Sequence, residues 1–269
     1  MRASRALSWW PALMVVVAVE ARPECLKPPC GERGVPEGDK EAYAAAVPRR
    51  EPGLSRAVQL CKQSEHHRKQ CEHRDVYVFG VFTGNSMRQM SIFFNNSGVR
   101  FRRIIGFDSF SGLPDGESAA MRKGYMVNWK AGEYSTSRVF GKNRMGEKEL
   151  LGALHAKIDD SRARFVKGFY NESLTPSLPT TLGLEPALFI DMDCDIYSST
   201  YQALEWMLTH GLIATGTILS YDDWGMGGAT GQKLAHAQLL AKFPKVTARM
   251  LAGTNARYHP EFEMQVRHS

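Results

Sequence analysis

Residues 76–86, with the sequence VYVFGVFTGNS, join a short apolar segment to a glycine-containing turn and the beginning of a helix. The β-branched and aromatic run from Val76 to Val81 predicts a buried strand. Gly80 and Gly84 allow a tight turn and a close approach of the backbone to a ligand. The pattern is not the G-x-G-x-x-G of dinucleotide sites and lacks the lysine of a phosphate-binding loop, so the turn alone does not identify a ligand.

Beyond this unit, apolar segments of strand length alternate with segments of helix length. The predicted later strands are 103–107, 165–166, 187–190, 216–220, 246–251 and 261–266, and the predicted helices are 84–95, 147–158, 198–209 and 229–242. Strands separated by helices indicate a parallel sheet covered on both faces. Because no full helix separates the last two strands, we expect an antiparallel hairpin at the C-terminal edge. The sequence thus predicts an α/β fold with a Rossmann-like, doubly wound sheet of seven strands.

Polar residues gather where the predicted strands end. The glycine turn follows the first strand, Asp108 follows the second, and aspartates follow the fourth and fifth. In open α/β sheets, ligands bind outside the carboxyl ends of the strands, so these clusters predict one binding cleft. Asp108 could accept hydrogen bonds from both hydroxyls of a ribose, although a helix cap or a turn is also open for it.

Two of these loops contain five aspartates: Asp191, Asp193, Asp195, Asp222 and Asp223. Carboxylates at adjacent strand ends repel one another unless a cation or protons intervene. Hard oxygen ligands select Mg²⁺, Mn²⁺ or Ca²⁺, so the pattern predicts a divalent metal site, although not all five residues can be ligands. Asp195 could equally cap the helix that begins after it.

Three segments carry a resemblance to a known family: GFDSFSGLP at 106–114, IDMDCDIYSST at 190–200 and SYDDW at 220–224. In this order and spacing they resemble the macrocin O-methyltransferase (TylF-like) family of class I S-adenosylmethionine (SAM)-dependent methyltransferases, which act on sugar hydroxyls of macrolides and related compounds. The resemblance extends from about Asp75 to the C-terminus. It implies the methyltransferase sheet and metal-dependent methyl transfer from SAM to a hydroxyl of a small molecule, a sugar or another diol-like acceptor.

The same resemblance implies roles for individual residues. The SAM-binding set would be Gly80, Val81, Gly84, Asn85, Ser86, Asp108, Ser109, Gly168 and Asn171. The glycine turn would line the methionine part of SAM, Asp108 would hold the ribose, and Gly168 and Asn171 would lie near the adenine. Mg²⁺ or another divalent cation would be bound by Asp193, Asp222 and Asp223.

The predicted mechanism is a single displacement step. A metal that chelates two neighbouring oxygens of the acceptor would lower the pKa of the hydroxyl and align its oxygen with the methyl group. For the base that takes the proton, the sequence offers His155, with Lys123 and Tyr125 as further candidates. His155 lies on the apolar face of its predicted helix, where a structural role is also open.

Two other functions are compatible with parts of the sequence. Asp191-Met-Asp193 and Asp193-Cys-Asp195 both match the D-x-D pattern of metal-dependent glycosyltransferases. That function leaves the glycine turn and the Asp222-Asp223 pair unexplained. A non-catalytic, methyltransferase-like binding protein is the second alternative, and Val78 supports it because family members usually carry an acid at this position.

The N-terminal region differs in composition from the rest of the chain. Arg2 and Arg5 precede an apolar stretch from Trp9 to Val19, which is typical of a targeting segment for the secretory pathway or an organelle; without such a segment the protein would be cytoplasmic. The predicted divisions are a targeting segment at 1–21, a linker at 22–53, and the methyltransferase domain at 54–269 with a helical cap at 54–74. No later stretch is apolar enough to cross a membrane.

Composition and cysteine content set further bounds. The 269 residues are 43% hydrophobic, which is enough for a sizeable core. The net charge of +6 comes without a run of five like charges, so it does not predict nucleic-acid binding, and the expected partner is a small-molecule acceptor. A homo-oligomer is left open. An oxidising compartment could pair Cys25, Cys30, Cys61 and Cys71, whereas Cys194 would stay free.

Overall fold

The computed structural model describes residues 37–115, 117, 122–125, 127–140 and 146–267, without the side chains of 37–49, 137 and 138. The chain divides into a unit Met1–Cys30 and a unit Gly31–Ser269, and all described residues belong to the second. The predicted targeting segment, Cys25 and Cys30 therefore lie outside the described residues. Among the helices that are described, none combines the length and apolar character needed to cross a membrane.

A sheet of seven strands forms the centre of the described unit, in the order β3-β2-β1-β4-β5-β7-β6. The parallel strands are β1 (Asp75–Phe79), β2 (Ile104–Asp108), β3 (Ala163–Lys167), β4 (Ala187–Met192) and β5 (Ile218–Tyr221). The antiparallel strands at the edge are β7 (Glu261–Val266) and β6 (Val246–Met250). This arrangement confirms the predicted α/β fold and its C-terminal hairpin.

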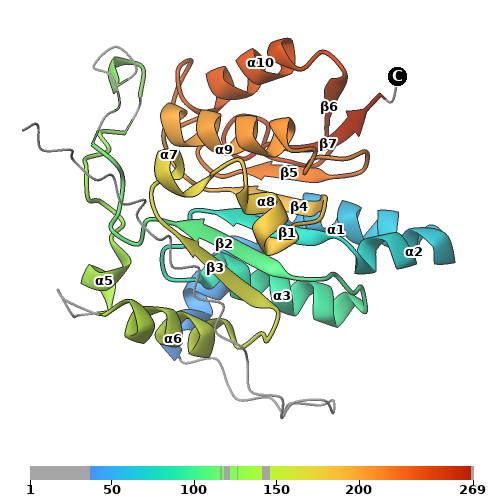
Figure 1. Ribbon diagram of the computed structural model, residues 1–269, viewed down its shortest axis with the longest axis horizontal. Coiled ribbons are helices and arrows are strands. Elements are labelled where there is room, and N and C mark those ends of the chain that lie inside the picture. The colour runs from blue at the N-terminus through green and yellow to red at the C-terminus, as the bar shows by residue number, and fades with distance from the viewer. Residues whose placement is uncertain (1–36, 116, 118–121, 126, 141–145, 268–269) are drawn as a thin grey trace, which may run out of the picture. The chain divides into compact units, whose positions relative to one another are not determined.

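Helices cover both faces of the sheet (Figure 1). One face packs against α1 (Glu37–Lys62), α3 (Asn85–Ser97) and α6 (Glu147–Ile158), and the other against α7 (Tyr170–Ser173), α8 (Leu178–Leu182), α9 (Tyr197–Thr209) and α10 (Gln232–Lys242). Alternate residues of β1 point to opposite faces, so Val78 joins the core under α1 and α3 while Phe79 joins the core under α9. All five residues of β1 are buried, as expected for a central parallel strand.

The N-terminal helices correct two predictions. The segment 22–53, predicted as a linker, is helical from Glu37 onward as part of α1. The helical cap predicted at 54–74 is two helices, because α1 ends at Lys62 and Ser64 caps a second helix, α2 (Glu65–Glu72). A Cys61–Cys71 disulfide joins the two helices. Cys194 is free, as predicted, and it is buried.

A long connection of residues 109–146, here called the insert, joins β2 to α6. Its described part contains the short helix α5 (Thr136–Val139). Two of its side chains bind the start of α9: Glu117 Oε2 accepts hydrogen bonds from the backbone and hydroxyl of Ser198, and Tyr125 Oη accepts one from the backbone N–H of Tyr197. The insert therefore packs against the helix that follows the β4 aspartates.

Candidate active site

Backbone hydrogen bonds tie together the carboxyl ends of the four central strands. The N–H of Gly80 donates to Phe107 at 3.0 Å, the N–H of Asp193 donates to Phe79 at 2.9 Å, and the N–H of Asp222 donates to Met192 at 3.2 Å. The residues that follow β1, β4 and β5 are therefore neighbours, as the strand ends of a parallel sheet require.

A cavity of about 500 Å³ opens at this edge, within the range typical of small-molecule sites. Its lining includes nearly all the residues that the sequence predicts as ligand contacts: Gly80, Val81, Asn85, Ser86, Asp108, Ser109, Gly168, Asn171, Asp193, Asp222 and Asp223. Gly84 and His155 are not among its lining residues. Gly84 instead takes the left-handed N-cap position of α3, with φ of 78°.

The glycine turn after β1 places the floor of the cavity against β4. Gly80 has φ of 94°, in the left-handed region that favours glycine. A Cβ atom at this position would collide with the carbonyl oxygen of Asp193. Only glycine therefore allows the turn to lie directly against the backbone of the acidic loop. Val78, a β1 residue two positions before Gly80, is fully buried and does not line the cavity.

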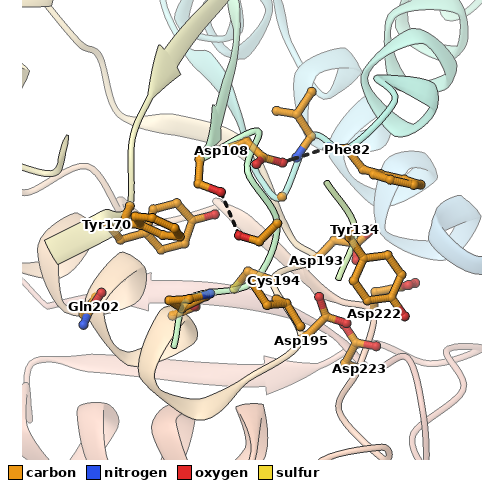
Figure 2. A pocket seen from close by; sticks show the side chains of 18 of the residues that line it. Phe82, Asp108, Tyr134, Tyr170, Asp193, Cys194, Asp195, Gln202, Asp222 and Asp223 are labelled. Atoms are coloured by element: carbon orange, nitrogen blue, oxygen red, sulfur yellow. Dashed lines mark hydrogen bonds between the residues drawn. The ribbon is translucent and has the colours of Figure 1, made fainter. Parts of the chain in front are cut away.

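Asp108 holds the glycine turn from the side of β2 (Figure 2). Its Oδ2 accepts hydrogen bonds from the N–H groups of Val81 and Phe82 at 2.8 and 2.9 Å, and its Oδ1 accepts one from Phe110 at 2.6 Å. Burial raises the pKa of Asp108, and the three backbone donors oppose that shift. Since a carboxylate offers about four acceptor positions, one remains for a ligand hydroxyl.

Three aspartates converge at the other end of the cavity. One carboxylate oxygen from each of Asp193, Asp222 and Asp223 lies within 4.8 Å of the others, a spacing that can hold a metal ion. Figure 2 shows these side chains grouped on one side, opposite Tyr170 and Gln202. Burial and then repulsion from Asp222 raise the pKa of Asp193 well above its usual range. The close approach of these carboxylates therefore opposes their ionisation.

Two further residues hold Asp223 in place. Gln232, the first residue of α10, accepts a hydrogen bond from the N–H of Asp223 and donates one to Met192, both at 3.0 Å. The N–H of Asp195 donates to the Asp223 carboxylate. Asp223 Oδ2 is nevertheless buried without a hydrogen-bond partner. A buried oxygen of this kind is suited to a cation.

Asp195 does not cap α9. The N-cap of that helix is Ile196, and no side chain caps it. Asp195 has a left-handed backbone, with φ of 60°, and it lines the cavity. Phe82 and Tyr134 also line the cavity with positive φ. Strained residues of this kind often occur at functional sites.

Arg50 is the main residue of the site that the sequence did not predict. It lies on α1, is 5% exposed and lines the cavity. Its Nε donates to Asp191 Oδ1 at 2.6 Å, and its Nη2 donates to Asp193 Oδ2 at 3.0 Å and lies 3.6 Å from Asp222 Oδ1. The predicted linker gave no signal for it, because two adjacent arginines, Arg49 and Arg50, in a proline-rich stretch do not indicate which of them is buried.

The predicted bases do not reach this cluster. His155 is half-buried, and its ring packs against Phe165 with centroids 4.9 Å apart, so it has the structural role that the sequence left open. Lys123 is exposed and does not line the cavity. Tyr125 is engaged by α9 and does not line the cavity either. The structure therefore corrects the assignment of His155 as the base.

The insert contributes an aromatic wall next to the aspartates. Tyr134 is 48% exposed, and its ring lies edge-on to Phe82 with centroids 5.7 Å apart. The charges of Asp195 and Asp223 contribute to the raised pKa of Tyr134, behind the larger effect of burial. Leu113 and Pro114 of the same insert also line the cavity. This end thus offers apolar surface beside the acidic cluster.

The sheet order, the helices on both faces and a cavity across the glycine turn and the strand-end acids are those of a class I SAM-dependent methyltransferase. The macrocin-O-methyltransferase (TylF) family matches residues 53–238. The chain belongs to this family and is a SAM-dependent O-methyltransferase.

Solved structures support the fold. The O-methyltransferase NovP is 23% identical, with 80% of each chain covered and a TM-score of 0.55. The calicheamicin methyltransferase CalS11 is 18% identical, with 87% of this chain and 99% of that chain covered and a TM-score of 0.53. No curated protein matches the sequence.

Proposed function

We propose that this O-methyltransferase transfers the methyl group of SAM to a hydroxyl of a small, diol-like acceptor that is held by a divalent cation on Asp193, Asp222 and Asp223. The observation that carries the proposal is the convergence of these three carboxylates beside the cavity, with the buried Asp223 Oδ2 lacking a partner. Three carboxylates form a hard-oxygen donor set that suits Mg²⁺ or Mn²⁺.

The opposite end of the cavity suits SAM. The glycine turn, with Asn85 and Ser86, would contact the methionine part, and the remaining acceptor position on Asp108 would take a ribose hydroxyl. Gly168 and Asn171 line the cavity after β3, where the adenine would lie. Gly80 connects the SAM end to the acidic end, because its backbone packs directly against the backbone of Asp193.

The acceptor would lie between the aspartates and the insert. A cation bound there would lower the pKa of a chelated hydroxyl. We assign Asp195 as the base that accepts the proton of that hydroxyl. It is a cavity-lining carboxylate outside the three-residue cluster. Tyr134 and Pro114 would cover the apolar side of the acceptor. A sugar-like acceptor accords with the macrocin-O-methyltransferase family to which the chain belongs.

The glycosyltransferase alternative accounts for less of the site. Of its two D-x-D patterns, the first fails because Asp191 is fully buried against Arg50 and does not line the cavity. Both acids of the second pattern, Asp193 and Asp195, line the cavity, but this function still gives no role to the glycine turn or to Asp222 and Asp223. Calorimetric titration with SAM and with nucleotide-sugars compares the two functions directly, and the same titration tests a non-catalytic relative, which would bind neither SAM nor a cation.

The deciding experiment measures methyl transfer from labelled SAM to a panel of acceptors with neighbouring hydroxyls, paired with their monohydroxyl analogues. We expect EDTA to lower the rate by at least about 100-fold, because a bound metal contributes several kcal/mol of charge stabilisation, and Mg²⁺ to restore it. Full activity in EDTA would remove the cation from the proposal and leave the SAM-binding part intact.

A further inference from the structure

Helix α1 brings a buried arginine to the edge of the acidic cluster. Arg50 contacts carboxylates on both β4 and the loop after β5, from 141 or more residues away in sequence. Its nearest partner is Asp191, which is 0% exposed and lies two residues before Asp193. Asp191 does not line the cavity, and its carboxylate binds Arg50 and the side chain of cavity-lining Ser86.

The same turn of α1 is fixed a second time. The N–H of Gly53 donates to Glu261 Oε2 of β7 at 2.7 Å. Leu54 and Ala57 follow in the core, with exposures of 1% and 0%. The packing of α1 therefore fixes the backbone of Arg50, and the hydrogen bond to Asp191 fixes its side chain. A buried ion pair of this kind is costly unless its geometry is well satisfied.

We propose that Arg50 is a positioning residue for the cation site. Nε is anchored on Asp191 while Nη2 binds Asp193 Oδ2, so the planar guanidinium fixes the orientation of the Asp193 carboxylate. The other oxygen of Asp193 is not engaged by Arg50. Partners that orient ligating carboxylates contribute strongly to metal affinity. The inference rests on the proposed function, in which Asp193 is a ligand.

A lysine at position 50 separates positioning from charge. Lysine keeps the positive charge beside the aspartates, but its single ammonium cannot reproduce the rigid fork that spans two carboxylates. Any change in cation affinity in Arg50→Lys therefore reports lost geometry rather than altered net charge.

Arg56 provides a matched control on the same helix. It binds Glu263 of β7 in a similar fork, with Nε 2.8 Å from Oε2 and Nη2 3.3 Å from Oε1, and it does not line the cavity. Arg56→Lys therefore weakens a contact between α1 and the sheet without touching the acidic cluster.

The test is calorimetric titration of the SAM-free protein with Mn²⁺, with circular dichroism as a check of folding. We expect Arg50→Lys to weaken Mn²⁺ binding by about 10- to 100-fold and Arg56→Lys to leave it unchanged. Equal binding by wild type and Arg50→Lys overturns the inference, as does an equal loss in both variants. If the wild type binds no Mn²⁺, the cation part of the proposed function fails instead.

A second variant covers the case in which Arg50→Lys does not fold. Asp191→Asn keeps the shape of the anchor but removes the charge that orients Arg50. We expect Mn²⁺ binding at least about 10-fold weaker, and unchanged binding overturns the inference. When both single variants fold, Arg50→Lys should add little in the Asp191→Asn background, because the two residues act as one unit.

Discussion

Asp108 and Asp223 lie at opposite ends of one cavity, and they differ in what satisfies their carboxylates (Figure 2). Asp108 accepts three hydrogen bonds from backbone N–H groups of the glycine turn and its own loop. Asp223 accepts one from the N–H of Asp195, and its Oδ2 is buried without a partner. The pKa of Asp223 is raised by burial first and then by repulsion from Asp195 and Asp222.

The difference shows which end is complete without a ligand. The Asp108 end is built from backbone donors, whose positions follow from the strands themselves. The acidic end depends on a side chain from a distant helix, Arg50, and, in the proposed function, on a bound cation. We therefore expect substitutions at the two ends to change stability in opposite directions, and substitutions between them to damage both.

Gly80→Ala should have the largest effect, because Gly80 connects the two ends. Alanine there would combine a left-handed backbone, which costs about 1–2 kcal/mol, with a collision against the Asp193 carbonyl. We expect both SAM and Mn²⁺ binding to be lost, and the midpoint of thermal unfolding to fall. Calorimetry for the two ligands and a thermal melt measure these effects.

Gly98→Ala is the matched control for that substitution. Gly98 also has a left-handed backbone, with φ of 71°, but a Cβ atom there would meet no other atom within 4 Å. It should cost only about 1 kcal/mol and leave both ligands bound. If Gly80→Ala behaves like Gly98→Ala, the glycine turn does not join the two ends as described.

His236 should make the free energy of unfolding fall at low pH. It is 7% exposed beneath the loop of Asp222 and Asp223, where its Nδ1 lies 2.9 Å from the hydroxyl of Tyr221. Burial lowers the pKa of His236 from 6.5 to about 4. Between pH 6.5 and 4, His236 therefore binds a proton in the unfolded chain but not in the folded chain. The contribution of the neutral His236 to stability is fully present above pH 6.5 and is lost as the pH falls toward 4.

The expected loss is about 3 kcal/mol in the free energy of unfolding between pH 7.5 and 4. His236→Gln keeps a hydrogen-bonding side chain but does not titrate, so it should lack this loss. Urea unfolding of wild type and variant across that range isolates the histidine from the aspartates, which are common to both proteins. Parallel pH profiles would mean that His236 does not resist protonation.

Most of the features that position the residues at the Asp108 end of the cavity could be predicted from the sequence. Hydrophobic periodicity predicts the strands, and the carboxyl ends of parallel strands must meet, so the order of residues alone places Asp108, Asp193 and Asp222 on one edge of the sheet. The glycine turn could be located for the same reason. These residues follow their strands directly, so an error of one or two residues in a strand boundary does not separate them.

The residues that sequence reasoning missed act across long distances or through backbone geometry. Arg50 lies in a stretch whose composition resembles a linker, and its partners come from β4 and the loop after β5. Gln232 acts as the first residue of a helix, a position that periodicity does not fix. The sequence allowed a helix-capping role for Asp195, because residue type does not reveal that its backbone is left-handed. The sequence indicated the apolar face of α6, but it did not indicate that His155 on this helix packs against Phe165.

The smallest predicted effects compare Asp108→Asn with Asp223→Asn in the absence of any cation. Asparagine at 108 turns an N–H₂ group toward backbone donors, so the free energy of unfolding should fall by about 1–3 kcal/mol. Asparagine at 223 keeps an oxygen for the N–H of Asp195 and removes one charge from a repelling cluster. There the free energy of unfolding should rise by about 1 kcal/mol.

Added Mg²⁺ should then reverse the order of the two variants. A ligand that binds only the folded state raises the unfolding midpoint in proportion to its affinity. Asp108→Asn keeps the three-carboxylate cluster and should gain stability from Mg²⁺ as wild type does, whereas Asp223→Asn should gain almost none. Thermal melts with and without Mg²⁺ measure both signs in one series. If Asp223→Asn is destabilised without the cation, its carboxylate is better satisfied than its buried Oδ2 indicates, and the contrast with Asp108 is wrong.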